Sequence, residues 1–249
     1  MSTRDDFASL VRREPVEVAT ALTLLAAEVT GEVPVVEVLS TLDALAVASR
    51  PHLAAAPSPA EALRRALGDD GGFGGREGDH GDLRASLLPA VLQRQRGLPV
   101  LLSVVWTEVA RRLEVPAHAL AVPGQVLVWV DGEVVDPWSG GRLLPPVEAA
   151  AARAHGPLEP LPLLLRVLAN VRALAARTSD TPTGLWACEL SLLLPRHPLE
   201  LRREHGTLLV RSGRFPEGAA ELEEFASVAP DPLAATARGE ARMARARLN

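Results

Sequence analysis

Residues 97–144 read GLPVLLSVVWTEVARRLEVPAHALAVPGQVLVWVDGEVVDPWSGGRLL, and this stretch decides the fold. Pro99 suits the first turn of a helix, because its fixed φ is helical and its missing N–H would lack a partner there. Apolar side chains then recur at helical spacing until residues 114–116 stop the run. They are Val100, Leu101, Val104, Val105, Val109 and Leu113. The pattern predicts a helix over roughly residues 99–113.

Three short strands are predicted directly after this helix. Runs of β-forming residues cover 119–122 and 126–130, and an Asp-Gly turn leads to a third run at 133–135. The third strand ends on Asp136 and Pro137. A helix followed by strands, the last of which ends on an aspartate, is a layout in which an active site can form.

In this order the segment resembles the transglutaminase-like core shared by transglutaminases, papain-type proteases and many amidases. In that core a cysteine opens the helix, a histidine lies on the next strand and an aspartate ends the following one. The helix N-terminus lowers the thiol pKa, the histidine takes the proton, and the carboxylate orients the imidazole. More closely, the motifs RGLP, VARRL, PGQVLV and DPWSGG resemble those of bacterial SirB-type proteins, in which a PGHFLV-like strand and a DPF-GG-like turn are typical.

Two departures from that pattern bear on catalysis. Gln125 stands where the histidine of the family would lie, and no cysteine is near the helix start. A glutamine amide forms hydrogen bonds but cannot accept a proton from a nucleophile. Ser103 offers a hydroxyl, which is a weak nucleophile without a base. Of the triad only Asp136 matches, so we interpret Ser103, Gln125 and Asp136 as a vestigial site.

Each of these positions also has a structural interpretation. Asp136 either served the triad or accepts hydrogen bonds from the turn that follows it. Gln125 either binds a polar ligand or satisfies Ser103 or Asp136. His118 is either a displaced base or an ordinary strand histidine, and Trp138 either forms the wall of a cleft or packs in the core.

Composition limits the classes of partner. The formal net charge of −5 argues against a general nucleic-acid binder. The single cysteine, Cys188, cannot form an internal disulfide, which favours a reducing compartment. The first residues lack a signal pattern, and no apolar run has membrane-spanning length. We therefore expect a soluble cytoplasmic protein without nucleic-acid or membrane partners.

Residues 68–81 are rich in glycine and acidic side chains. The segment lacks the lysine and hydroxyl of a phosphate-binding loop, and its acidic residues lack the order of a calcium-binding loop. It is predicted to be an exposed loop with Phe73 anchoring its middle. No cofactor and no metal are expected.

The rest of the chain shows helical patterns. They cover residues 7–50 with a break at 30–34, residues 60–67 after a cap at Ser58, and residues 83–95 and 147–154. Prolines between residues 156 and 162 separate a tail with a weak 34-residue repeat, whose small residues Gly206 and Gly218 and closing Pro230 resemble a tetratricopeptide repeat. A capping helix is predicted at 233–248.

The sequence thus predicts an α+β, mostly helical fold. Residues 1–156 hold a helical N-terminal part and the degenerate transglutaminase-like core with its small antiparallel sheet, and residues 157–249 hold tetratricopeptide-like helices. The predicted function is a non-catalytic scaffold that binds a protein or peptide through the repeat tail. The alternative is a hydrolase or amide transferase with a rebuilt site, for example Ser103 with His118.

Overall fold

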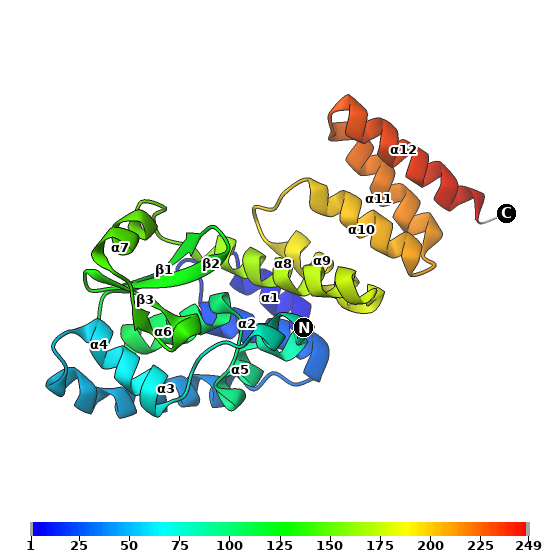
Figure 1. The fold of residues 1–249 in the computed structure, drawn as a ribbon. Coiled ribbons are helices and arrows are strands. Elements are labelled where there is room, and N and C mark those ends of the chain that lie inside the picture. The colour runs from blue at the N-terminus through cyan, green and yellow to red at the C-terminus, as the bar shows by residue number, and fades with distance from the viewer. Residues whose placement is uncertain (1, 248–249) are drawn as a thin grey trace. The chain divides into compact units, whose positions relative to one another are not determined.

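The computed structural model describes residues 2–247, and these residues form mostly helices with one small sheet (Figure 1). This confirms the predicted α+β, mostly helical class. Contacts divide the chain into a first unit, residues 1–167, and a second unit, residues 168–249. The predicted boundary after residue 156 stays a prediction.

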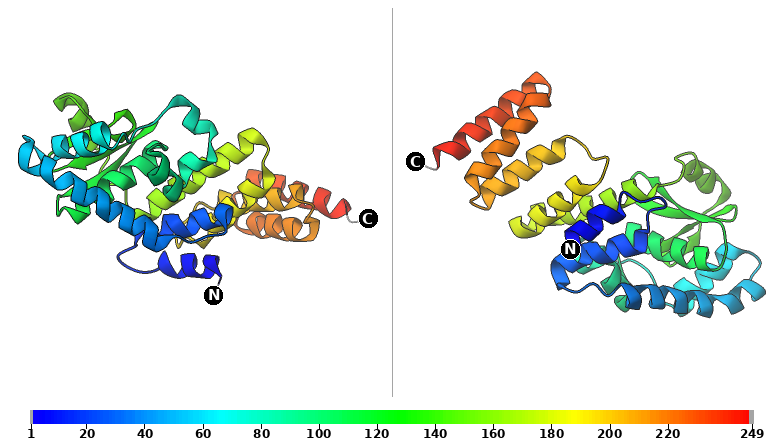
Figure 2. Two further views of the ribbon diagram at one scale, coloured as in Figure 1. Left: turned by 90° about the horizontal axis from the view of Figure 1, so that it is seen from below. Right: turned by 180° about the vertical axis from the view of Figure 1, so that it is seen from behind.

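The first unit begins with helices that pack in sequence order (Figure 2). Ser2 and Asp5 form a capping box at the start of α1, and Arg4 of α1 pairs with Glu28 of α2 at 2.7 Å. Gly31 ends α2 in the left-handed conformation, which glycine adopts without steric cost. The helices are α1 (Thr3–Leu10), α2 (Val18–Thr30), α3 (Val35–Ala55) and α4 (Pro59–Leu63), the last capped by Ser58 as predicted.

Most residues of the glycine-rich segment are exposed, as predicted, but the segment is only partly a loop. A π-helix at Arg64–Asp70 and a 3-10 helix at Glu77–Gly81 lie at its two ends. Phe73 is buried and meets the Trp106 ring edge-on at 6.1 Å, which confirms its anchoring role. The Asp79 carboxylate is also buried, and it accepts hydrogen bonds from Arg96 Nη2 at 2.6 Å and from the Arg76 backbone at 2.8 Å. These tertiary contacts compensate for the low helical propensity of glycine.

The single helix predicted at 83–95 is divided in two, a 3-10 helix at Leu83–Ser86 and α5 at Leu88–Arg94. Pro89 explains the break, because it has no N–H to donate to the carbonyl four residues earlier. That carbonyl, of Ala85, instead accepts from the Leu98 backbone at 2.9 Å.

The predicted helix and strands of residues 97–144 are confirmed. An antiparallel sheet in the order β1-β2-β3-β4 follows α6, with Leu120 opposite Leu127. Alternate side chains point to opposite faces: α6 packs against β1 and β2, and α7 covers the other face through Ala149 and Ala152 (Figure 1). The elements are α6 (Pro99–Arg112), β1 (Ala117–Val122), β2 (Gln125–Val130), β3 (Glu133–Asp136), β4 (Arg142–Leu143) and α7 (Pro146–Arg153).

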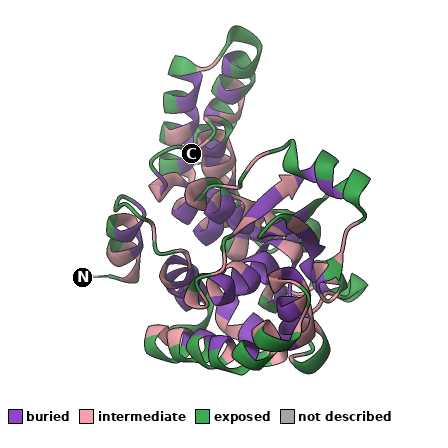
Figure 3. Ribbon diagram, turned by 90° about the vertical axis from the view of Figure 1, so that its left-hand side faces the viewer, coloured by how far each residue is buried: buried purple, intermediate pink, exposed green. Residues whose placement is uncertain are grey.

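Helix α8 (Pro160–Thr178) crosses the division, and the second unit continues as a series of packed helices. Each helix buries one side, coloured purple in Figure 3. A Cβ at Gly218 would lie 2.8 Å from the Gly206 carbonyl oxygen, so the two glycines let α10 and α11 approach closely. The helices are α9 (Thr181–Leu193), α10 (Glu200–Arg211), α11 (Phe215–Val228) and α12 (Asp231–Ala246). The capping helix predicted at 233–248 corresponds to α12. Leu248, the last residue of that prediction, lies outside the described residues.

Candidate functional site

Ser103 lies in the first half of α6 with no exposed surface. Its Oγ donates to the Val100 carbonyl at 2.7 Å, within the same helix. The hydroxyl therefore satisfies its hydrogen bond locally and has no access to a substrate in solution.

Gln125 opens β2 and is exposed. Its backbone carbonyl accepts from Arg166 at 3.3 Å, whereas its side chain has no hydrogen-bond partner among residues 2–247. Because side chains alternate along β2, Gln125 lies on the same face of the sheet as Leu127, and this face packs against α7. Helix α6, which carries Ser103, packs on the opposite face. The sheet thus separates Gln125 from Ser103.

Asp136 ends β3 and is buried. Its Oδ1 accepts from the Trp138 backbone at 3.0 Å, and its Oδ2 accepts from Ser139 Oγ at 2.7 Å. Its carbonyl accepts from the Gly141 backbone at 2.8 Å. Both carboxylate oxygens are used within the turn, which supports the structural interpretation of this residue.

Trp138 is held by the glycine-rich segment. The Gly75 backbone donates to the Trp138 carbonyl at 2.9 Å, and a Cβ at Gly75 would lie 1.8 Å from the indole ring. On another side the ring lies 5.3 Å from the ring of His80. Trp138 therefore packs between segments of the first unit.

His118 lies on β1 directly opposite Trp129 of β2, and the two rings stack at 4.9 Å. Burial lowers the pKa of His118, and the Glu159 carboxylate partly opposes this effect. Its alternation places it on the α7 face, with Leu120, and away from the helix that carries Ser103.

These five side chains do not form a relay for a proton. General-base catalysis requires a base within hydrogen-bond distance of the nucleophile, and the hydrogen bond that Ser103 donates goes to its own helix. Within the described part of the chain, no three His, Cys, Asp or Glu side chains are placed to hold a metal ion. No helix among residues 2–247 combines the length and apolarity needed to cross a membrane.

The second unit contains a groove of about 910 Å³ that is lined by side chains of α8 to α12. Ion pairs connect three of these helices across it. Arg172 of α8 pairs with Glu204 of α10, and Arg203 of α10 pairs with Glu240 of α12 at 2.6 Å. The sequence analysis did not predict these residues. Two signals pointed to them: the polar side chains of α10 recur at helical spacing, and the 34-residue period relates α8, α10 and α12 to one another.

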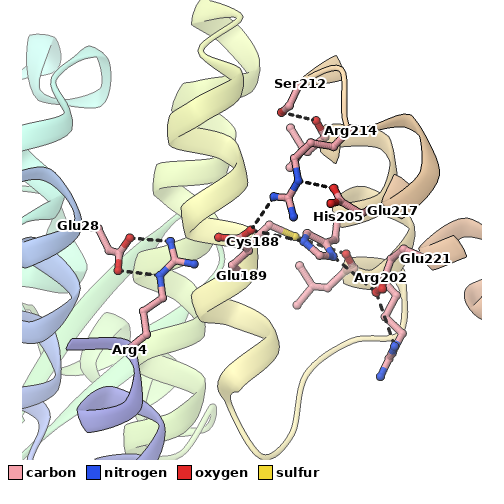
Figure 4. Close-up of polar contacts among 12 residues, drawn as sticks. Arg4, Glu28, Cys188, Glu189, Arg202, His205, Ser212, Arg214, Glu217 and Glu221 are labelled. Carbon is pink, nitrogen blue, oxygen red and sulfur yellow. Dashed lines mark hydrogen bonds and ion pairs between the residues drawn. The ribbon is translucent and has the colours of Figure 1, made fainter. Parts of the chain in front are cut away.

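Cys188 lies in α9, where burial raises its pKa to about 12. The thiol is therefore protonated at neutral pH, and its nearest polar partner is the Leu201 carbonyl at 3.4 Å. Nearby, His205 lies between Glu189 at 3.7 Å and Glu221 at 3.6 Å (Figure 4). These contacts of His205 connect α9, α10 and α11. Because its thiol is protonated, Cys188 lacks the thiolate that an activated nucleophile needs.

Two family models match successive, overlapping parts of the chain. Residues 36–178 match the model of the transglutaminase-like superfamily, and residues 171–249 match a tetratricopeptide repeat model. A UPF0162 protein of Xylella fastidiosa strain Temecula1 is 29% identical over 195 residues, which cover 70% of this chain and 69% of the relative. A UPF0162 protein of Pseudomonas aeruginosa is 43% identical over 65 residues, 25% of this chain and 24% of that protein. No solved structure matches.

The transglutaminase-like match covers more than half of the chain and includes α6 with the whole sheet. It agrees with the order of helix, strands and terminal aspartate described above. The chain therefore belongs to the transglutaminase-like superfamily.

Proposed function

We propose that this protein is a non-catalytic, SirB-type member of the superfamily that holds a protein or peptide partner in the groove of its second unit. The observation that carries the proposal is the groove itself, with a volume of about 910 Å³ and a lining contributed by five helices. Helical repeats use such concave surfaces for recognition. The resemblance to a tetratricopeptide repeat supports this interpretation.

The geometry of the first unit supports the absence of catalysis. Ser103 is buried and Gln125 supplies no base, and the carboxylate of Asp136 is used by its own turn. In this proposal the transglutaminase-like core is a scaffold. We also propose a cytoplasmic location, because the single cysteine allows no internal disulfide.

Ala176 offers a direct test of the groove, because it is exposed on α8 and lines the groove. Ala176→Arg should fill part of the groove and remove the partners that the purified full chain captures from a bacterial lysate after cross-linking. The matched control is Ala235→Arg, at an exposed position of α12 outside the groove. Equal capture by both variants would remove the groove as the binding surface.

A second test addresses the hydrolase or transferase alternative. We expect no turnover of a panel of peptides, amides and esters above the rate of the buffer. Ser103→Ala should leave this result unchanged, because its hydroxyl has no exposed surface. Turnover by the natural chain that Ser103→Ala abolishes would refute the non-catalytic proposal.

A further inference from the structure

The charged side chains of the groove fall into two groups. Those in its middle neutralise one another through the pairs Arg172–Glu204 and Arg203–Glu240. Asp180 is also used, because it caps α9 by accepting from the Thr183 backbone at 3.1 Å. None of these groups needs a partner from outside the chain.

Two exposed charges remain, one at each end of α10. Glu200 lies in its first turn and Arg211 in its last turn, and both line the groove. Neither side chain has a hydrogen bond or ion pair with any residue between 2 and 247. The groove therefore has an acidic end and a basic end that remain available to a ligand.

The floor between the two ends is apolar. Ala175 and Ala176 of α8, Leu208 of α10, Phe225 of α11 and Leu233 of α12 contribute to it. Leu233 is an exposed large hydrophobic residue, so part of this floor contacts solvent. An apolar side chain between the two charges of a ligand would cover it.

The distance between Glu200 and Arg211 sets the spacing of the charges in the ligand. Glu200 and Arg211 are eleven residues apart on α10, which corresponds to about 16 Å at a rise of about 1.5 Å per residue. A helical ligand would need about eleven residues to span that distance. An extended chain covers about 13 Å in four residues, and long charged side chains close the remaining gap.

We propose that the groove binds an extended peptide with a basic and an acidic side chain four residues apart, an inference that rests on the proposed function. The basic side chain pairs with Glu200 and the acidic one with Arg211. An even spacing keeps both on the same face of the peptide, together with the residue midway between them. That central residue is apolar and lies on the floor formed by Leu208 and its neighbours.

The test uses four capped, fluorescein-labelled pentapeptides. The first is arginine-alanine-leucine-alanine-glutamate, and in the others both ends are glutamate, both arginine, or both alanine. Fluorescence polarisation with the full chain should give the arginine-glutamate peptide a Kd about two- to fivefold lower than either like-charged peptide, the size of one exposed ion pair. The difference should shrink at high salt, which screens exposed charges.

Charge reversal makes the inference specific. Arg211→Glu should shift the preference to the diarginine peptide, and Glu200→Arg should shift it to the diglutamate peptide. The double variant should prefer the arginine-glutamate peptide again, bound in reverse. Arg242→Glu, at an exposed position of α12 outside the groove, should keep the natural preference.

Both charges also suit the dipole of α10, so their reversal weakens the helix ends. Circular dichroism melts identify any variant that loses its fold, and Arg211→Gln and Glu200→Gln then replace it, with loss of the preference as the expected result. If all four peptides had equal Kd values and Ala176→Arg abolished their binding, the inference about charge would be refuted, whereas the groove would remain the binding surface. Binding that is insensitive to Ala176→Arg, or no binding of the arginine-glutamate peptide at about 1 mM, would overturn the inference as well.

Discussion

Residue by residue, the first unit shows how an aspartate at the end of a strand holds the turn that follows it. Asp136 matches the triad pattern, yet its two oxygens hold the turn of Trp138 and Ser139. The glycine-rich segment then packs on that turn so closely that a Cβ at Gly68 would lie 1.9 Å from the Gly140 carbonyl oxygen. The DPWSGG motif thus has a packing role that needs no catalysis.

This packing predicts a strong effect for Gly75→Ala. Its Cβ would lie 1.8 Å from the Trp138 ring, which must move. We expect a loss of about 1–3 kcal/mol in the free energy of unfolding, as in other overpacked sites, measured by urea denaturation. Gly78→Ala is the matched control, because a Cβ there meets nothing within 4 Å. Similar values for the two variants would contradict the close packing of Gly75 on Trp138.

His118 predicts a pH dependence of stability. Burial lowers the pKa of its imidazole below the ordinary value for histidine, so the folded chain binds fewer protons there than the unfolded chain. Its contribution is present above the unfolded pKa and is lost as the pH falls through and below that value. Between about pH 7.5 and about pH 5.5, His118→Gln should lose less free energy of unfolding than the natural chain. Equal losses in the two proteins would show that the pKa of His118 is the same in both states.

At the level of elements, close helix contacts in the second unit depend on small residues. A Cβ at Gly206 would lie 2.8 Å from Leu222 and 3.1 Å from the Gly218 carbonyl oxygen. Gly206→Ala should therefore push α10 and α11 apart and lower the free energy of unfolding by about 1–3 kcal/mol.

Gly239 of α12 provides the opposite prediction, because the nearest atom to its Cβ would be 4.0 Å away. Gly239→Ala should raise helix stability by about 0.5–1 kcal/mol through the smaller entropy of the unfolded chain. Circular dichroism melts of both variants measure the effects. A stabilising Gly206→Ala would contradict the close contact of α10 with α11.

Element prediction from the sequence succeeded where the pattern is local. The helical spacing after Pro99 and the strand runs after residue 116 place α6, β1, β2 and β3 within about two residues, which is the usual uncertainty of helix and strand ends. It failed where residues far apart in the sequence determine the local structure. The packing of residues 68–81 depends on Phe73 meeting Trp106 and on Asp79 meeting Arg96, and neither partner is near in sequence.

The candidate site shows the same limit. Residue types alone show that Gln125 is not a base and that no cysteine lies near the start of α6. The sequence could not reveal that Ser103 is buried or that Gln125 lies on the other face of the sheet from α6. The groove residues escaped prediction because they converge from five helices.

For the whole molecule, α8 decides where the chain can be divided. Its first part belongs to the first unit, in which Leu163, Leu164 and Val167 are buried. Just before α8, the Leu158 backbone donates to the Ala119 carbonyl on β1 at 2.8 Å. A boundary after residue 156 would separate these residues from the rest of the first unit.

The last prediction compares two fragments, residues 1–156 and residues 1–178. The shorter fragment loses three buried aliphatic side chains, each contributing about 1.5–3 kcal/mol, which together approach the whole stability of a typical domain. We expect it to aggregate or melt without cooperativity, and residues 1–178 to melt cooperatively in circular dichroism. Equal, cooperative melts of both fragments would instead support the boundary after residue 156, because α8 would then be dispensable for the transglutaminase-like core.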